Sequence, residues 1–136
     1  MRSMSLLLIT ATIGSCAPVQ PVERTPQAEA HLQTLLSGKV AGPPVSCLPE
    51  YRANDMVVID DSTILFRDGR RTIYRNDLQG GSCSRLGSGN YALLTRRTGG
   101  IGLCRGDIAE VKDLTNGFTV GSCVMGDFVP YTKPRG

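Results

Sequence analysis

The sequence predicts a mainly β fold, an antiparallel sandwich or small barrel of about seven short strands with one N-terminal helix and two disulfides. From residue 45 onward, short runs rich in β-branched and aromatic residues alternate with turn signals. Residues 25–37 carry one apolar stripe with helical spacing. Trp is absent and aromatic residues make up only 5% of the chain, so the core is thin and disulfides are expected to support it.

Residues 1–15 are typical of a signal peptide. Arg2 provides a basic start, and residues 4–13 form an apolar run that is shorter than the roughly 20 residues needed to cross a bilayer. The following Ile13-Gly14-Ser15-Cys16 resembles the lipobox of bacterial lipoproteins, in which the Cys is acylated and becomes the mature N-terminus. The resemblance implies that Cys16 carries lipid and forms no disulfide. The alternative is an ordinary secretory signal cleaved nearby, with Cys16 incidental.

Residues 16–44 are predicted to form a lipidated tether that contains the helix. Residues 17–24 hold two prolines and no apolar period, which indicates a flexible spacer. Thr25 as N-cap and Pro26 at the first helical position predict where the helix begins. Residues 38–44 are rich in Gly and Pro and are predicted to be a second linker.

The helix is predicted to end at residue 37 and to pack on the β domain. A helix of roughly 12 residues is marginal alone, so its apolar stripe needs a partner surface. The stripe consists of four residues spaced for one face: Ala28, Leu32, Leu35 and Leu36.

The β domain is predicted to cover residues 45–131, with a short tail over 132–136. Three strands with polar turns between them predict a meander: 56–59, 63–66 and 72–76. Two further pairs of strands flank turn signals, Gly99-Gly100 in the first pair and Asn116-Gly117 in the second: 91–95 with 101–104, and 107–111 with 118–124.

Four cysteines lie in this domain, Cys47, Cys83, Cys104 and Cys123, and predict two structural disulfides. Their wide spacing favours neither a zinc site nor a thioredoxin-type redox motif. Four cysteines allow three connectivities, and the sequence does not choose among them. We favour Cys47 with Cys123 and Cys83 with Cys104, because the first pair would tie the start of the domain to its final strand.

Charge indicates little about partners. Residues 45–131 hold ten basic and ten acidic side chains, so nucleic-acid binding is not expected. Arg outnumbers Lys twelve to three, and the pairs Arg70-Arg71 and Arg96-Arg97 are candidate contacts for an anionic glycolipid or an acidic envelope protein. The alternative is that these arginines are solvated ends of hairpins.

No catalytic, metal or cofactor site is predicted. His31, the only histidine, lies in the predicted helix, far in sequence from any candidate nucleophile. Asp60 and Asp61 are adjacent at a predicted turn, so we expect them to cap it rather than act as an acid and base. Arg105-Gly106-Asp107 spells an integrin-binding tripeptide, but Asp107 is expected to start a strand or cap its turn.

Four segments together resemble an uncharacterised family of small proteobacterial envelope proteins over roughly residues 45–127. They are Cys47-Leu48, residues 72–78 leading to Cys83, residues 103–108, and Gly121-Ser122-Cys123. The resemblance implies an extracytoplasmic fold and carries no activity.

These observations predict a non-catalytic envelope module, structural or partner-binding, that is held at a membrane by lipid. Ala17 after the lipidated Cys resembles lipoproteins sorted to the outer membrane, so we expect its periplasmic face. The alternative is an inhibitor of an envelope-attacking hydrolase such as a lysozyme, since small disulfide-bonded β lipoproteins include such inhibitors. Electrostatic complementarity to a basic lysozyme favours an acidic inhibitor, whereas this domain is neutral.

Overall fold

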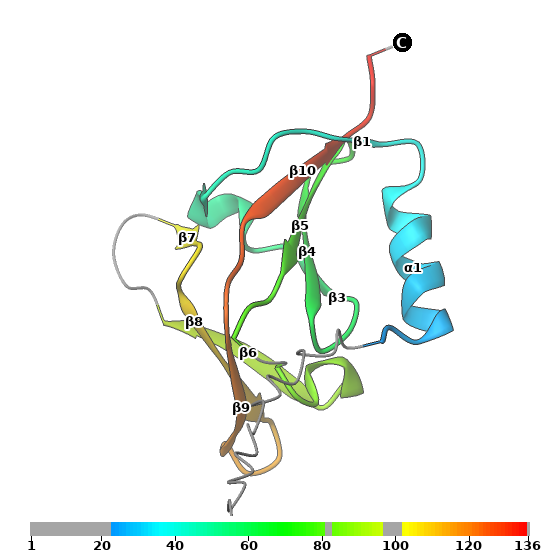
Figure 1. The fold of residues 1–136 in the computed structure, drawn as a ribbon. Coiled ribbons are helices and arrows are strands. Elements are labelled where there is room, and N and C mark those ends of the chain that lie inside the picture. Colours follow the sequence, from blue (N-terminus) through cyan, green and yellow to red (C-terminus); the bar gives the residue numbers. More distant parts are fainter. Residues whose placement is uncertain (1–22, 81–82, 97–101, 136) are drawn as a thin grey trace, which may run out of the picture.

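The computed structural model describes residues 23–80, 83–96 and 102–135, and these form a mainly β fold with one α-helix (Figure 1). The helical segments are α1 (Pro26–Leu36) and two short 3₁₀ helices, η1 (Glu50–Arg52) and η2 (Leu86–Ser88). The strands are β1 (Val40–Ala41), β2 (Cys47–Leu48), β3 (Met56–Val58), β4 (Thr63–Asp68), β5 (Thr72–Asp77), β6 (Tyr91–Arg96), β7 (Leu103–Cys104), β8 (Ile108–Asp113), β9 (Thr119–Val124) and β10 (Phe128–Thr132).

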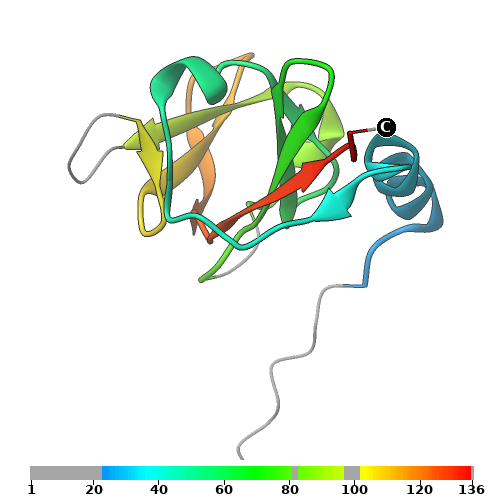
Figure 2. The same ribbon diagram turned by 90° about the horizontal axis from the view of Figure 1, so that it is seen from above.

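The described strands form three antiparallel sheets around one main core. The largest has the order β1-β10-β5-β4-β3, a second has the order β6-β8-β9, and β2 pairs with β7 alone. Buried side chains from all three sheets meet in the core, where Phe66 and Phe128 pack edge to face with ring centroids 5.7 Å apart. Figure 2 shows the two larger sheets on opposite sides of this core. They do not close into a barrel, since the described structure shows no pairing between the edge strands β3 and β6.

A strand is present at each of the seven predicted positions. The meander is confirmed, because β4 pairs with both β3 and β5. The hairpin at Asn116-Gly117 is confirmed, since β8 pairs with β9 and Gly117 has a φ of 76°. The pairing implied by Gly99-Gly100 is wrong, because β6 pairs with β8 and β7 pairs with β2. Gly99 and Gly100 themselves lie outside the described residues.

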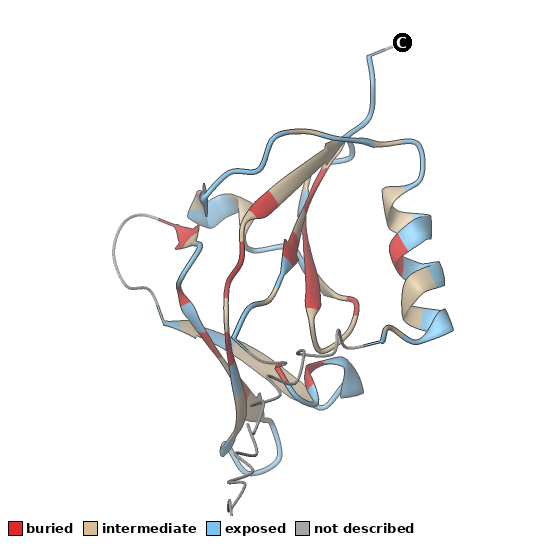
Figure 3. Ribbon diagram, in the orientation of Figure 1, coloured by how far each residue is buried: buried red, intermediate tan, exposed pale blue. Residues whose placement is uncertain are grey.

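The helix packs on the domain as predicted. The Thr25 side chain caps it by accepting a hydrogen bond from the Ala28 amide at 3.2 Å. Leu32 is only 2% exposed and lies in a second core cluster with three residues of the large sheet and its turn, Ile59, Leu65 and Ile73. Figure 3 shows the buried position of α1 on the side that faces the sheet. The helix therefore covers the outer face of this sheet.

The favoured disulfide pairing is wrong. Cys47 pairs with Cys104, directly opposite it in the β2–β7 ladder, and Cys83 pairs with Cys123. The reason is that β9 is not the final strand. The final strand is β10, and its Phe128 forms a backbone bridge to Val45, so hydrogen bonds rather than a disulfide tie the start of the domain to its end.

Candidate functional site

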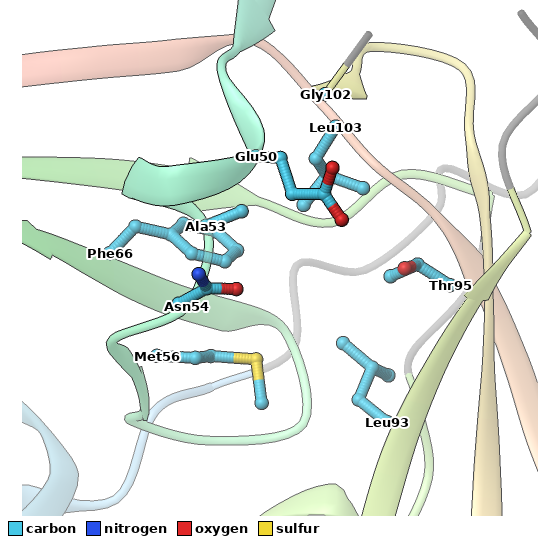
Figure 4. Close-up of a pocket in the computed structure, with 9 residues that line it drawn as sticks. All are labelled: Glu50, Ala53, Asn54, Met56, Phe66, Leu93, Thr95, Gly102 and Leu103. Atoms are coloured by element: carbon cyan, nitrogen blue, oxygen red, sulfur yellow. The ribbon is translucent and has the colours of Figure 1, made fainter.

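A cleft opens where the two larger sheets fail to close, between the edge strands β3 and β6 (Figure 4). We call it the edge cleft, and its volume is about 240 Å³. Nine residues from η1, four strands and the segments beside them line it: Glu50, Ala53, Asn54, Met56, Phe66, Leu93, Thr95, Gly102 and Leu103. The cleft thus combines segments that are far apart in the sequence.

The edge cleft has an apolar interior and a polar rim. Phe66 and Leu103 are 1% and 5% exposed and belong to the main core, so they provide a fixed floor. Met56 is 37% exposed, and Figure 4 shows its side chain facing that of Leu93 across the cleft. The same view shows the Glu50 carboxylate directed into the cleft. A few polar groups around an apolar interior are typical of binding sites.

Gly102 is required for the shape of one wall. Its φ is +118°, and a Cβ at this position would lie 2.1 Å from the Leu48 carbonyl oxygen. Only glycine therefore allows β7 to approach β2 so closely. This approach places Leu103 in the cleft, and the Cys47–Cys104 disulfide holds the two strands together.

Arg52 fixes the opposite wall. Its guanidinium donates to the Tyr74 hydroxyl at 2.9 Å and lies within 3.0 Å of the Asp68 carboxylate. It also lies over the rings of Tyr51 and Tyr74, at 5.3 and 5.8 Å from their centroids. Desolvation opposes the charge of Arg52, but Tyr74 and Asp68 outweigh it and raise its pKa. These contacts attach η1, and with it Glu50, to the meander.

A second concave region of about 290 Å³ lies between the start of α1 and the β3–β4 turn. Arg24 occupies it, with its Nε 2.6 Å from the Asp60 carboxylate and its Nη2 donating to the Thr63 hydroxyl at 2.6 Å. These contacts join the segment before α1 to the β domain. We therefore interpret this region as a structural contact of α1 and not as a binding site.

The prediction that the adjacent carboxylates cap their own turn is confirmed for Asp60, whereas the Asp61 side chain caps a different segment. Asp60 accepts a hydrogen bond from the Ser62 amide at 2.8 Å, which forms an Asx turn. Asp61 accepts from the amides of Arg85 and Gly87, both at 3.0 Å, at the start of η2. Both carboxylates are therefore occupied by structural contacts.

The structure describes three of the predicted anionic-contact arginines, Arg70, Arg71 and Arg96, and it places the first two far from the third. Arg70 and Arg71 lie at the β4–β5 turn, and Arg71 donates to the carbonyls of Lys133 and Pro134 at 3.2 and 3.3 Å. Arg96 ends β6 and lies 2.9 Å from the Glu110 carboxylate. Figure 1 shows the β4–β5 turn near the C-terminus, well separated from the end of β6. Arg97 and Cys16 lie outside the described residues.

The remaining residues considered in the sequence, His31 and Asp107, do not form a catalytic or binding site in the described structure. His31 is exposed on α1. Asp107 of the integrin-like tripeptide is fully buried and accepts a hydrogen bond from the Cys104 amide at 2.8 Å, so it caps its turn as expected. Within residues 23–80, 83–96 and 102–135, no three His, Cys, Asp or Glu side chains gather as a metal site. In the same residues, no helix combines the length and apolar character needed to cross a membrane.

Comparison of the chain with protein-family models, with curated proteins and with solved structures found no match. The edge cleft is therefore interpreted from its own geometry. The sequence does not distinguish the residues of this cleft from core residues, because apolar side chains such as Met56 and Leu93 in predicted strands are typical of a core. One signal in the sequence could have indicated the site. Residues 91–95 form a predicted strand with no proline and no charge before Arg96, so the strand would be unprotected at a sheet edge.

Proposed function

We propose that this protein is a non-catalytic envelope module that binds a partner in the edge cleft. The observation that carries the proposal is the cleft itself. Its floor, formed by Phe66 and Leu103, belongs to the main core, so the cavity is formed before any partner arrives. A preformed concave site binds a partner with little loss of its own conformational entropy, which favours a role in recognition.

We further propose that lipid on Cys16 anchors the module to the outer membrane, facing the periplasm. The lipobox-like Ile13-Gly14-Ser15-Cys16 supports the anchor. The disulfides Cys47–Cys104 and Cys83–Cys123 support an oxidising compartment, since such bonds form and persist outside the reducing cytosol.

Intact mass and fractionation test the anchor. The natural chain is produced in a Gram-negative host, next to the variant Cys16→Ser as the matched control. We expect an acylated mass beginning at Cys16 and recovery with outer membranes, and loss of both in Cys16→Ser. An unmodified Cys16 in the natural chain would refute the anchor and leave the binding proposal to its own test.

Site-directed photo-crosslinking in intact cells tests the binding role. A photoreactive amino acid replaces Met56 at the edge cleft or, as the control, the exposed Gln27 on α1. We expect a discrete cross-linked species from position 56 and none from position 27. Equal cross-linking at both positions, or none at position 56, would contradict a binding role for the cleft.

A further inference from the structure

β6 is an open sheet edge that borders the edge cleft. Among the described strands it pairs only with β8, through six residue pairs from Tyr91–Asp113 to Arg96–Ile108. Proteins protect long edges with charges, prolines or bulges, yet β6 has no proline and no charge before its last residue, Arg96. Such an edge can accept another extended chain.

The hydrogen-bond register shows which backbone groups of β6 face the open side. The Leu114 amide donates to the Asn90 carbonyl at 3.2 Å. Because hydrogen-bonded and non-hydrogen-bonded pairs alternate in an antiparallel ladder, even-numbered residues of β6 bond to β8. The N–H and C=O groups of three residues therefore point away from β8: Tyr91, Leu93 and Thr95.

The far side of β8 supports this assignment. The Met125 amide donates to the Asp107 carbonyl, and the Asp113 amide donates to the Phe118 carbonyl, both at 2.9 Å. Odd-numbered residues of β8 thus bond to β9, which leaves its even-numbered residues for β6. Two of the three outward-facing residues of β6, Leu93 and Thr95, also line the edge cleft.

The surroundings of the cleft favour a single chain over a second sheet. Opposite β6, the cleft is bounded by η1 and β3 through Glu50, Asn54 and Met56. The β6 edge of a second copy would arrive with β8 and β9 attached, whereas one extended segment needs only the width of a strand, about 4.8 Å. The cavity of about 240 Å³ is smaller than the roughly 300–1,000 Å³ pockets that hold drug-sized molecules. It suits a side chain instead.

We propose that the partner is an extended peptide segment of another envelope protein, which adds to β6 as a further strand and places an apolar side chain in the edge cleft. In this mode of recognition, backbone hydrogen bonds supply affinity and a side-chain pocket supplies selectivity. The inference rests on the proposed binding role of the cleft.

Synthetic nine-residue peptides test strand addition to the purified full chain in detergent. Each has alternating threonine and valine, a lysine at each end and a central phenylalanine, leucine or aspartate. We expect the phenylalanine or leucine peptide to bind and to slow amide exchange at Tyr91, Leu93 and Thr95 by about tenfold or more. The aspartate peptide should bind more weakly, because its charge would be desolvated in an apolar cleft. Absence of binding by all three peptides would overturn the proposal.

Backbone methylation separates strand addition from side-chain binding. The binding peptide is remade with N-methyl groups on alternate residues, which removes strand-pairing donors and leaves the side chains unchanged. We expect its affinity to fall by about tenfold or more. Equal affinity of the two peptides would refute strand addition while the edge cleft stayed a binding site, so this failure differs from failure of the proposed function.

The variants Thr95→Pro and Leu94→Val give the test on the protein. Proline is tolerated at edge positions whose N–H faces away from the sheet, so Thr95→Pro should keep the fold and lose peptide binding. Leu94 is 50% exposed and does not line the edge cleft, so Leu94→Val should keep both the fold and the binding. Unchanged binding by folded Thr95→Pro would contradict the register. If Thr95→Pro does not fold, the methylated peptide decides. Self-association of the natural chain that the peptides displace would show that a second copy is the occupant and would overturn the proposal.

Discussion

Arg24 connects the segment before α1 to the rest of the molecule through three side chains. Its guanidinium contacts Asp60 and Thr63, both at 2.6 Å, and Glu29 at 3.1 Å. The Arg24 side chain is 19% exposed, so these contacts are only partly screened by water. We expect Arg24→Gln to lower the free energy of unfolding by about 1–2 kcal/mol, measured by urea denaturation. The exposed Glu23→Gln serves as control, and an equal effect of both changes would contradict a specific role for Arg24.

The same contact makes stability depend on acid. Burial opposes ionisation of Asp60, but hydrogen bonds from Arg24 and Ser62 outweigh it, so its pKa lies below the ordinary 3.8. A carboxyl with a lowered folded-state pKa stabilises the protein above its ordinary pKa and loses that contribution as pH falls through the folded-state value. Melting temperatures from pH 7 downward should therefore fall more below about pH 4 in the natural chain than in Arg24→Gln. Parallel pH curves would refute this assignment.

Asn76 is a buried amide on which the chain before β10 depends. It is fully buried, donates to the Gly126 carbonyl at 2.7 Å and accepts from the Gly126 amide at 3.0 Å. We expect Asn76→Ala to cost about 2–3 kcal/mol in the free energy of unfolding, since it leaves two buried backbone groups without partners. The exposed Asn54→Ala should change stability by less than about 0.5 kcal/mol. Similar values for the two variants would contradict the role of this buried pair.

At the scale of elements, the two disulfides differ in access. Cys83 and Cys123 are 0% and 2% exposed, whereas Cys47 lies exposed on the two-residue strand β2. Thiol–disulfide exchange requires access of the attacking thiolate. We therefore expect mild reductant under native conditions to open Cys47–Cys104 first. Alkylation and peptide mass mapping should find label on Cys47 and Cys104 before Cys83 and Cys123, and the reverse order would contradict the packing described.

The strands that sequence predicted are those with their own local signals. The meander and the hairpin at Asn116-Gly117 have polar turns between apolar runs, and these signals determine local pairing. The strands β1 and β2 have only two residues each, which is too short to show the alternation of apolar and polar residues that predicts a strand. β10 contains Pro130, and proline within a run argues against a strand. The predicted pairing of residues 91–95 with 101–104 was wrong, because β6 pairs with β8, which comes later in the sequence. The glycines between the two predicted strands do not determine this pairing.

At the scale of the whole molecule, the position of the candidate site could not be predicted from local sequence patterns. The edge cleft forms only because the large sheet ends at β3 and the smaller sheet ends at β6 without pairing. Such a gap depends on the global arrangement of sheets, and no short motif reports it. The arginine pairs show the opposite case, in which a clear sequence pattern does not form a site. Arg71 and Arg96 each contact a neighbouring group of the fold, and the two contacts lie on separate sheets.

The position of Arg24 also limits how far the domain can lie from a membrane. If Cys16 is lipidated, residues 17–23 separate it from Arg24, which contacts Asp60 of the domain. Seven extended residues reach at most about 25 Å. Arg24 and the start of α1 would then lie close to the membrane that holds the lipid, which agrees with the proposed envelope protein as the partner.

α1 belongs to the fold of the whole molecule rather than to a detachable tether. Leu32 is 2% exposed and covers Ile59, Leu65 and Ile73 on the large sheet. We expect Leu32→Ala to reduce the free energy of unfolding by about 2–4 kcal/mol, whereas Ala30→Ser on the exposed side of α1 should cost less than about 0.5 kcal/mol.

Truncation extends this test from one contact to the entire helix. A chain that begins at residue 23 should melt like the full chain, because it retains Arg24 and α1. A chain that begins at residue 38 should melt at a lower temperature and self-associate, since removal of α1 exposes the apolar face of the sheet to water. Equal melting of the two shortened chains, measured by circular dichroism, would show that the helix contributes nothing to the domain and serves only to connect it.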